Sequence, residues 1–177
     1  MIRKILNVRD PRLREPSKPV IGMDKKVEQI VRDLVDTLAI QKEPEGVGLA
    51  APQIGKNLKI FVFSFKDVSR VCINPEILAL STTSHKSQVT SNKSLMEGCL
   101  SLPNYYGPLK RSAVVKLKYT DEKGSEKVEE FKDFYAQIVL HEIDHLNGKL
   151  FIDRLLQEKK PLFKLDKNGE WEEVELT

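Results

Sequence analysis

The segment His141-Glu-Ile-Asp-His145 constrains this chain more than any other, because two histidines four residues apart flank a glutamate in an HExxH pattern. On a helix, residues four apart lie on one face, so both imidazoles can reach one metal ion. Glu142 can then reach a water bound to that ion. Apolar neighbours and Gly148, a helix-ending residue, predict a buried helix around the motif. The pattern favours a metal-dependent hydrolase, with a plain core helix holding two structural histidines as the alternative.

Two histidines leave a metal ion under-coordinated, so a further ligand has to come from elsewhere in the chain. Cys72 lies among apolar residues and is predicted to be an inert core residue. Cys99 lies in Glu97-Gly-Cys-Leu-Ser101, where a buried structural residue and a metal ligand are both open interpretations. His85 lies in the polar stretch 81–94, which is predicted to be an exposed, mobile loop, so we expect a solvated histidine there.

Length and composition predict a single catalytic domain over residues 1–177. The net charge of +3 is too small to indicate direct, sequence-specific nucleic-acid binding. No apolar run approaches the roughly 18 residues that suggest a membrane span, and the first residues do not form a secretory signal. Two cysteines do not form a disulfide framework, so we expect a cytoplasmic location.

Residue periodicity predicts several elements. Asp24 is expected to cap a helix that runs to about Gln41, and Asp133 is expected to cap the helix of the HExxH pattern. Asn74-Pro75 is expected to end the second of four strands. These strands are predicted at 59–65, 71–73, 113–120 and 127–131. The segment from about 157 to 177 is expected to be a variable extension that forms a short hairpin.

Three stretches, in this order, resemble the peptide deformylase family: Gly46-Val-Gly-Leu-Ala-Ala-Pro-Gln53, Glu97-Gly-Cys-Leu-Ser101 and His141-Glu-Ile-Asp-His145. The resemblance covers the chain from about Lys4 to Leu155. It implies an α+β fold in which antiparallel sheets wrap around a central metal-binding helix. Members of the family remove the formyl group from the initiator methionine of new bacterial or organellar polypeptides. The implied partners are formylmethionyl nascent peptides and the ribosome near its exit tunnel, with no membrane partner.

The resemblance also implies a role for each matching position. It implies that Cys99 is the metal ligand that completes the set with His141 and His145, and that ferrous iron is the native ion. Zinc, nickel and cobalt also suit this soft donor set.

For catalysis, the resemblance implies that Glu142 is the general base and acid. The side-chain amide of Gln53 and the backbone N–H of Leu100 hold the developing oxyanion. The implied substrate contacts fall on small or apolar positions: Gly46, Val47, Gly48, Gly98 and Ile138.

Some positions depart from the family. Leu140 stands where the family usually has a glutamine, so a hydrogen bond behind the metal ligands is missing or comes from another residue. Tyr105 and Tyr106 stand where many relatives have an arginine or glycine at the cleft edge, which leaves the contacts beyond methionine open. Arg111 is expected to form a structural salt bridge with Glu97.

Two other functions compete with deformylation. A zinc peptidase with the HExxH pattern takes its third ligand downstream of the helix, and Asp153 and Glu158 are the candidates here. A catalytically silent, ribosome-associated relative is the second alternative. Such a protein would be expected to lose a ligand or the base, whereas this chain retains them all.

Overall fold

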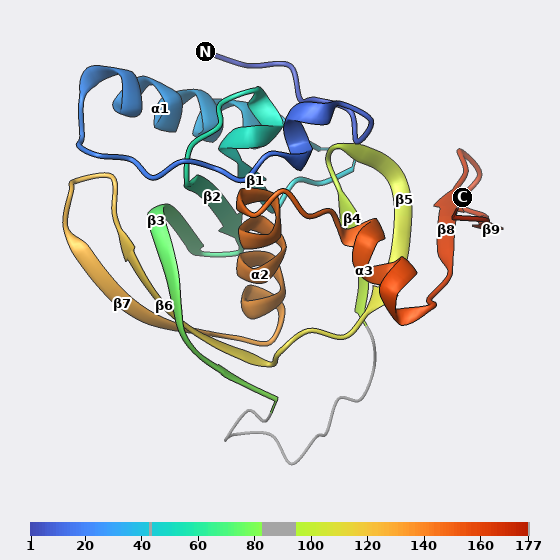
Figure 1. Ribbon diagram of the computed structural model, residues 1–177. Coiled ribbons are helices and arrows are strands. Elements are labelled where there is room, and N and C mark those ends of the chain that lie inside the picture. Colours follow the sequence, from blue (N-terminus) through green and yellow to red (C-terminus); the bar gives the residue numbers. More distant parts are fainter. Residues whose placement is uncertain (43, 83–94, 177) are drawn as a thin grey trace.

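Within the residues that the structure, a computed structural model, describes (1–42, 44–82 and 95–176), the chain forms two antiparallel sheets and three α-helices (Figure 1). The five-stranded sheet has the order β1 (Gly48–Ala50), β2 (Ile60–Phe65), β3 (Val68–Ser81), β6 (Val114–Thr120), β7 (Glu126–Lys132). The four-stranded sheet has the order β4 (Leu95–Cys99), β5 (Leu102–Leu109), β8 (Leu162–Leu165), β9 (Trp171–Val174). The helices are α1 (Lys25–Ala39), α2 (Phe134–Leu146) and α3 (Phe151–Glu158), with short 3-10 helices η1 (Pro11–Arg14) and η2 (Ala51–Ile54). The expected α+β class is confirmed.

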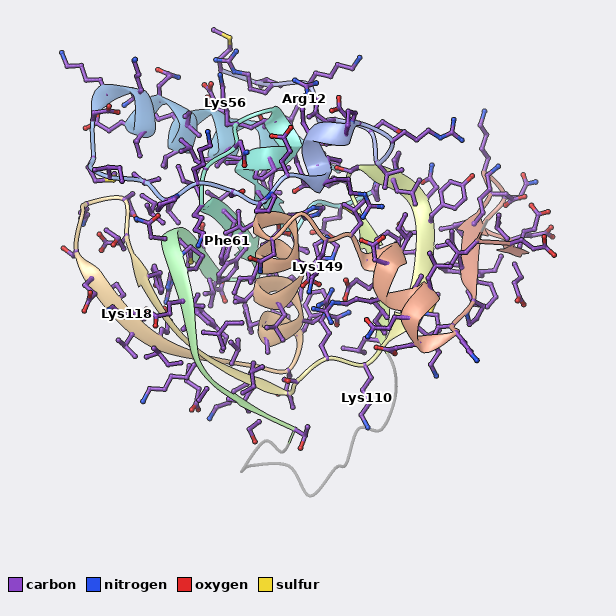
Figure 2. The ribbon with its side chains drawn as sticks, viewed as in Figure 1. Arg12, Lys56, Phe61, Lys110, Lys118 and Lys149 are labelled. Atoms are coloured by element: carbon purple, nitrogen blue, oxygen red, sulfur yellow. The ribbon has the colours of Figure 1, made fainter. Side chains whose placement is uncertain are left out.

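Helix α2 stands in the middle of the molecule, with β6 and β7 on one side and β4 and β5 on the other (Figure 1). It shares a buried core with β2 and β6, and Figure 2 shows Phe61 inside this core and Lys56 at the surface. The helix residues in the core are Ala136, Ile138, Val139 and Leu146. No helix in the described parts of the chain is both long and apolar enough to cross a membrane.

Helix α1 forms as its sequence predicts and ends two residues earlier than expected. The Asp24 carboxylate accepts hydrogen bonds from the N–H groups of Lys26 and Val27, both at 2.9 Å. The predicted apolar face, which includes Leu34 and Leu38, is buried against β1 and β2. This face therefore anchors the helix beside the strand that carries Gly48.

The expected end of a strand at Asn74-Pro75 is wrong. Strand β3 continues through this dipeptide, and its register with β6 shifts between Ile73 and Glu76. Asn74 has a φ of 50°, and its side-chain amide bonds to the backbone N–H and C=O of Val20 at 2.8 and 2.7 Å. A bulge of this kind lets a strand accommodate a proline without ending.

The expected side-chain cap at Asp133 is also wrong. Asp133 precedes α2 but has a φ of 53°, and its carboxylate makes no capping hydrogen bond. Its backbone N–H donates to the Ala113 carbonyl at 2.7 Å, which holds the start of the helix next to β6. At the other end, Gly148 has a φ of 69°, and a Cβ there would meet the Arg14 carbonyl carbon at 2.8 Å. The predicted stop at Gly148 therefore meets a real steric requirement.

Several other predicted elements are confirmed. Strands β2, β6 and β7 lie within one or two residues of their expected bounds, and the C-terminal hairpin forms as β8 and β9. Strands β1, β4 and β5 and helix α3 were not predicted. The mobile loop was expected over 81–94, but Ser81 is the last residue of β3. Residues 83–94, including His85, lie outside the described part of the chain.

Candidate active site and metal centre

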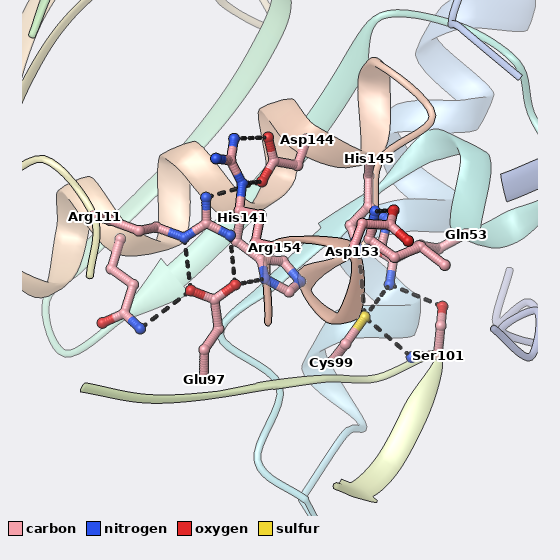
Figure 3. A network of polar contacts seen from close by, with 12 residues as sticks. Gln53, Glu97, Cys99, Ser101, Arg111, His141, Asp144, His145, Asp153 and Arg154 are labelled. Carbon is pink, nitrogen blue, oxygen red and sulfur yellow. Dashed lines mark hydrogen bonds and ion pairs between the residues drawn. The ribbon is translucent and has the colours of Figure 1, made fainter. Parts of the chain in front are cut away.

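Three potential metal ligands meet between helix α2 and strand β4. His141 and His145 come from one face of α2, and Cys99 comes from the last position of β4. Their donor atoms all lie within 4.8 Å of one another, and the Cys99 sulfur lies 3.3 Å from His145 Nε2 (Figure 3). The exposed fractions are 9% for Cys99, 9% for His141 and 1% for His145. Among the described residues, this is the donor group able to hold a metal ion.

The ring of His141 is oriented by Glu97, whose Oε1 lies 2.6 Å from His141 Nδ1. This contact leaves the Nε2 lone pair free for a metal ion. Glu97 is itself held by Arg111, whose Nε donates to Oε2 at 2.6 Å, so the predicted salt bridge is confirmed. Burial opposes ionisation of Glu97, but Arg111 and His141 outweigh burial and hold the pKa of the carboxyl well below its usual range.

Gln137, one turn before Leu140 on α2, provides a hydrogen bond behind the three potential ligands. The Gln137 side-chain amide donates to Glu97 Oε2 at 3.3 Å, while Leu140 packs against the apolar core. The buried charge network continues from Arg111 to Asp144 at 2.9 Å and then to Arg154 on α3 (Figure 3). Two arginines and two carboxylates thus neutralise each other behind the histidines.

The sulfur of Cys99 accepts polar contacts that suit a thiolate. The Ser101 backbone N–H and the Gln53 Nε2 lie 3.4 and 3.5 Å from the sulfur. Burial alone would raise the pKa of this thiol, but the charge of His145 and the hydrogen bonds from both imidazoles hold it well below its ordinary value. Cys72 differs, because it is fully buried in the core and burial raises its pKa, as expected for an inert residue.

The amide of Gln53 has a fixed orientation. Its Oε1 accepts the Ala50 N–H at 2.8 Å, so its Nε2 is directed toward Cys99 and toward the Ser101 hydroxyl oxygen at 3.1 Å. Sequence analysis included Ser101 in a family stretch but gave it no role. Ser101 and Gln53 are 48 residues apart in the sequence, so no local pattern could indicate their contact.

Glu142 is buried beside the donor group without a partner for one oxygen. Its Oε2 has no hydrogen bond within the described part of the chain, and burial raises its pKa to about 7. Gly48 lies directly against this carboxylate, and a Cβ there would come within 2.9 Å of Glu142 Cδ. A buried, unpartnered carboxyl group is costly, which marks Glu142 as a functional group.

A cavity of about 340 Å³ opens beside these residues. Its walls include ten of the eleven predicted site residues: Gly46, Val47, Gly48, Gln53, Gly98, Cys99, Leu100, Ile138, His141 and Glu142. His145 lies behind them. Sequence analysis missed three apolar wall residues, Phe65, Met96 and Phe134. Phe65 was predicted only as a strand residue, and Met96 lies in a strand that was not predicted. Tyr105 and Tyr106, which were expected at the cleft edge, also line the cavity.

Of the two third ligands expected for a zinc peptidase, Asp153 is engaged elsewhere, and neither Asp153 nor Glu158 belongs to the donor group found among the described residues. The Asp153 carboxylate accepts the Leu150 N–H at 2.8 Å and pairs with Arg14. A cysteine donor, beside a helix that carries two histidines and a free carboxylate in an α+β fold, is typical of the class of metal-dependent hydrolases.

Comparisons with known proteins identify the family within that class. The family model for polypeptide deformylase matches residues 2–161. The peptide deformylase of Dictyoglomus thermophilum is 40% identical over 158 residues, 89% of this chain and 95% of that protein. The peptide deformylase of Chlorobaculum parvum is 37% identical over 174 residues, 94% of this chain and 86% of that protein. The chain belongs to the peptide deformylase family and is an enzyme.

Solved structures agree with this assignment. The crystal structure of peptide deformylase from Thermotoga maritima has a TM-score of 0.75 and 34% identity, and the match covers 86% of this chain and 97% of that one. The peptide deformylase of Ehrlichia chaffeensis in complex with actinonin has a TM-score of 0.77 and 31% identity, over 89% of this chain and 91% of that one.

Proposed function

We propose that this peptide deformylase removes the formyl group from formylmethionyl nascent peptides in the cavity beside α2, with a divalent metal ion held by Cys99, His141 and His145. The observation that carries this proposal is the proximity of these three donors to the unpartnered Glu142 carboxylate at one cavity. We further propose that residues 1–177 act as one catalytic domain in the cytoplasm, near the ribosomal exit tunnel where such peptides emerge.

The donor set fits a metal ion. The Glu97 contact orients the His141 ring, and the polar contacts at the Cys99 sulfur suit a thiolate donor. A sulfur and two imidazole nitrogens suit ferrous iron, which we propose as the native ion, and they also suit zinc, nickel and cobalt. When bound, the ion supplies Lewis-acid chemistry, which activates water and polarises the formyl carbonyl.

Glu142 moves the protons of the reaction. It accepts a proton from the attacking water, whose oxygen bonds to the formyl carbon, and delivers that proton to the leaving nitrogen as the C–N bond breaks. The products are formate and a free methionyl amine. The pKa of about 7 suits both steps, because the carboxyl can accept and release a proton near neutral pH.

Gln53 and Leu100 stabilise the negative charge that develops on the formyl oxygen. The Gln53 amide is fixed through Ala50, which keeps its Nε2 beside Cys99 at the proposed metal centre. Leu100 follows Cys99 directly and lines the same cavity, where its backbone N–H is the second proposed donor.

The substrate backbone is expected to bind along β1, an edge strand. The Val47 carbonyl accepts the Ser64 N–H at 2.9 Å on the β2 side, so the polar backbone groups of Gly48 point to the opposite side. An extended peptide can pair with such an edge, with Gly46 and Gly98 leaving room for its backbone. Ile138, together with two phenylalanines of the cavity wall, forms an apolar pocket for the methionine side chain.

The test compares kcat/KM on formyl-Met, acetyl-Met and formyl-Asp peptides. The acetyl methyl group must displace packed atoms, so we expect roughly 10–200-fold discrimination against acetyl-Met, and poor turnover of formyl-Asp in the apolar pocket. Glu142→Gln should lower turnover by roughly 10²–10⁴-fold while metal content is retained. Equal kcat/KM for formyl and acetyl substrates, or cleavage of the internal peptide bond, would contradict the proposal and favour a peptidase.

A further inference from the structure

The hairpin of β8 and β9 lies outside the residues 2–161 that match the family model, yet it is part of the sheet that carries Cys99. Strand β8 pairs with β5, so that Lys164 lies opposite Tyr105 and Phe163 lies opposite Tyr106. Figure 1 shows the hairpin beyond β5, at the side of the molecule. The hairpin therefore extends the sheet from β5, the strand whose Tyr105 and Tyr106 line the cavity.

Buried contacts fix the base of the hairpin. Leu162 is almost fully buried in the same apolar cluster as Cys99 and Leu155, and Tyr105 packs against that cluster from its edge. The Lys164 ammonium lies 5.9 Å from the centre of the Tyr105 ring, within the range of a cation–π contact. Movement of β8 would therefore be transmitted to Tyr105.

Tyr106 is held between the hairpin and the metal-site strand. On one side, the Trp171 ring of β9 meets it edge-on, with centroids 5.4 Å apart at 70°. On the other side, the Tyr106 ring covers Gly98, and a Cβ at Gly98 would come within 2.6 Å of the ring. Gly98 directly precedes Cys99 in β4, so Trp171, Tyr106 and β4 are in contact one after another.

We propose that Trp171 is a positioning residue that fixes Tyr106 as the wall facing the substrate residues after methionine, and that this wall selects apolar or aromatic side chains there. The inference rests on the proposed function, which places the formyl group at Cys99 and the methionine side chain beside Ile138. A peptide that leaves this end of the cavity passes Tyr105 and Tyr106, which line it next to Gly98. Aromatic faces favour apolar and aromatic side chains over charged ones.

The test measures the Trp171→Ala variant on formyl-Met amide and on formyl-Met-Ala-Phe. An edge-on aromatic contact of this kind corresponds to roughly 2–10-fold in affinity, so KM for the longer substrate should rise by that factor while kcat is retained. The short substrate should change by less than about twofold, because it does not reach Tyr106. Trp171→Phe, which keeps an aromatic ring, should restore most of the loss.

Two controls separate positioning from general damage. Leu156 on α3 has the same exposed fraction as Trp171, 52%, so Leu156→Ala is a matched truncation of a surface apolar residue and should leave both substrates unchanged. In a Tyr106→Ala background, Trp171→Ala should have no further effect on the longer substrate. An equal loss on both substrates, an unchanged KM for the longer one, or a full additional loss in the Tyr106→Ala background would overturn the inference.

Failure of the proposed function looks different. In that case the wild-type enzyme itself would not process formyl-Met amide, whereas failure of the inference leaves that activity intact. The chain has one tryptophan, so its intrinsic tryptophan fluorescence comes from Trp171 alone. Saturating Met-Ala-Phe product should change this emission, while Met amide should not. If calorimetry shows that Met-Ala-Phe binds but the emission does not change, this result would also contradict the proposal that the hairpin positions Tyr106.

Discussion

Gly48 provides a sharp test of the active-site geometry, because only hydrogen separates its backbone from the proposed base. Gly48→Ala introduces a Cβ that would lie 2.9 Å from Glu142 Cδ, and closer still to one carboxylate oxygen. Ordinary contacts begin at about 3.4 Å, so the carboxyl group must retreat by at least about 0.5 Å. The backbone of Gly48 does not have a positive φ, so alanine itself is tolerated there.

The expected loss follows from that displacement. Catalytic groups need placement within about 0.5 Å, and a shift of about 1 Å can cost roughly 10²-fold in rate. We therefore expect Gly48→Ala to lower kcat by roughly 10–10²-fold on formyl-Met peptides. Metal content should be unchanged, because the three atoms nearest the new methyl group all belong to Glu142, which is not one of the proposed ligands.

The assay combines steady-state kinetics, metal analysis and thermal melting. Gly22→Ala is the matched control, because a Cβ there meets no atom within 4 Å and should leave kcat unchanged. In a Glu142→Gln background, Gly48→Ala should cost less than about twofold, since the displaced base is already inactive. Normal kcat in Gly48→Ala, or a full additional loss in the Glu142→Gln background, would refute displacement of the base as the cause.

Further predictions concern the metal and pH. Cys99→Ser should lose most bound metal, whereas Cys72→Ser should retain it, and equal metal loss by elemental analysis would exclude Cys99 as the specific ligand. Chelation should lower the thermal midpoint, because metal at about 100 times its Kd stabilises the native state by about 2.7 kcal/mol. The hydrogen bond from Arg70 lowers the pKa of Glu129. The stability from this pair is present above the unfolded pKa of about 4.3 and is lost as pH falls, so urea denaturation should show a flatter acid dependence for Glu129→Gln.

Local patterns in the sequence predicted the parts of the site that depend on short-range geometry. The spacing of His141 and His145 places both imidazoles on one face of α2 wherever that helix packs. Cys99 lies 42 residues before His141, so its meeting with the histidines depends on the pairing of β4 with β5 and on the packing of α2. Only resemblance to a family could indicate that meeting before the structure.

The elements that sequence analysis missed have weak local signals. Strand β5 contains Pro103, Gly107 and Pro108, residues that disfavour strands, and it forms because β4 and β8 pair with it on both sides. Gly107 is required there, since a Cβ would meet the side chain of Leu155 on α3. From the sequence alone, Gly107 resembles a turn residue. The structure shows instead that glycine is needed there for packing against α3.

The sheet edges of this enzyme also bear on aggregation. An exposed strand edge invites pairing with another chain, and charged side chains on outward edges oppose it. The outer edges here are β7, which is rich in glutamate and lysine, and β9, which contains Glu172 and Glu173. The inner edges are β4 and the three-residue strand β1, and both border the cavity. The molecule therefore keeps its least charged edge short and recessed, which limits the growth of intermolecular sheets at the edge where we propose that one extended peptide pairs.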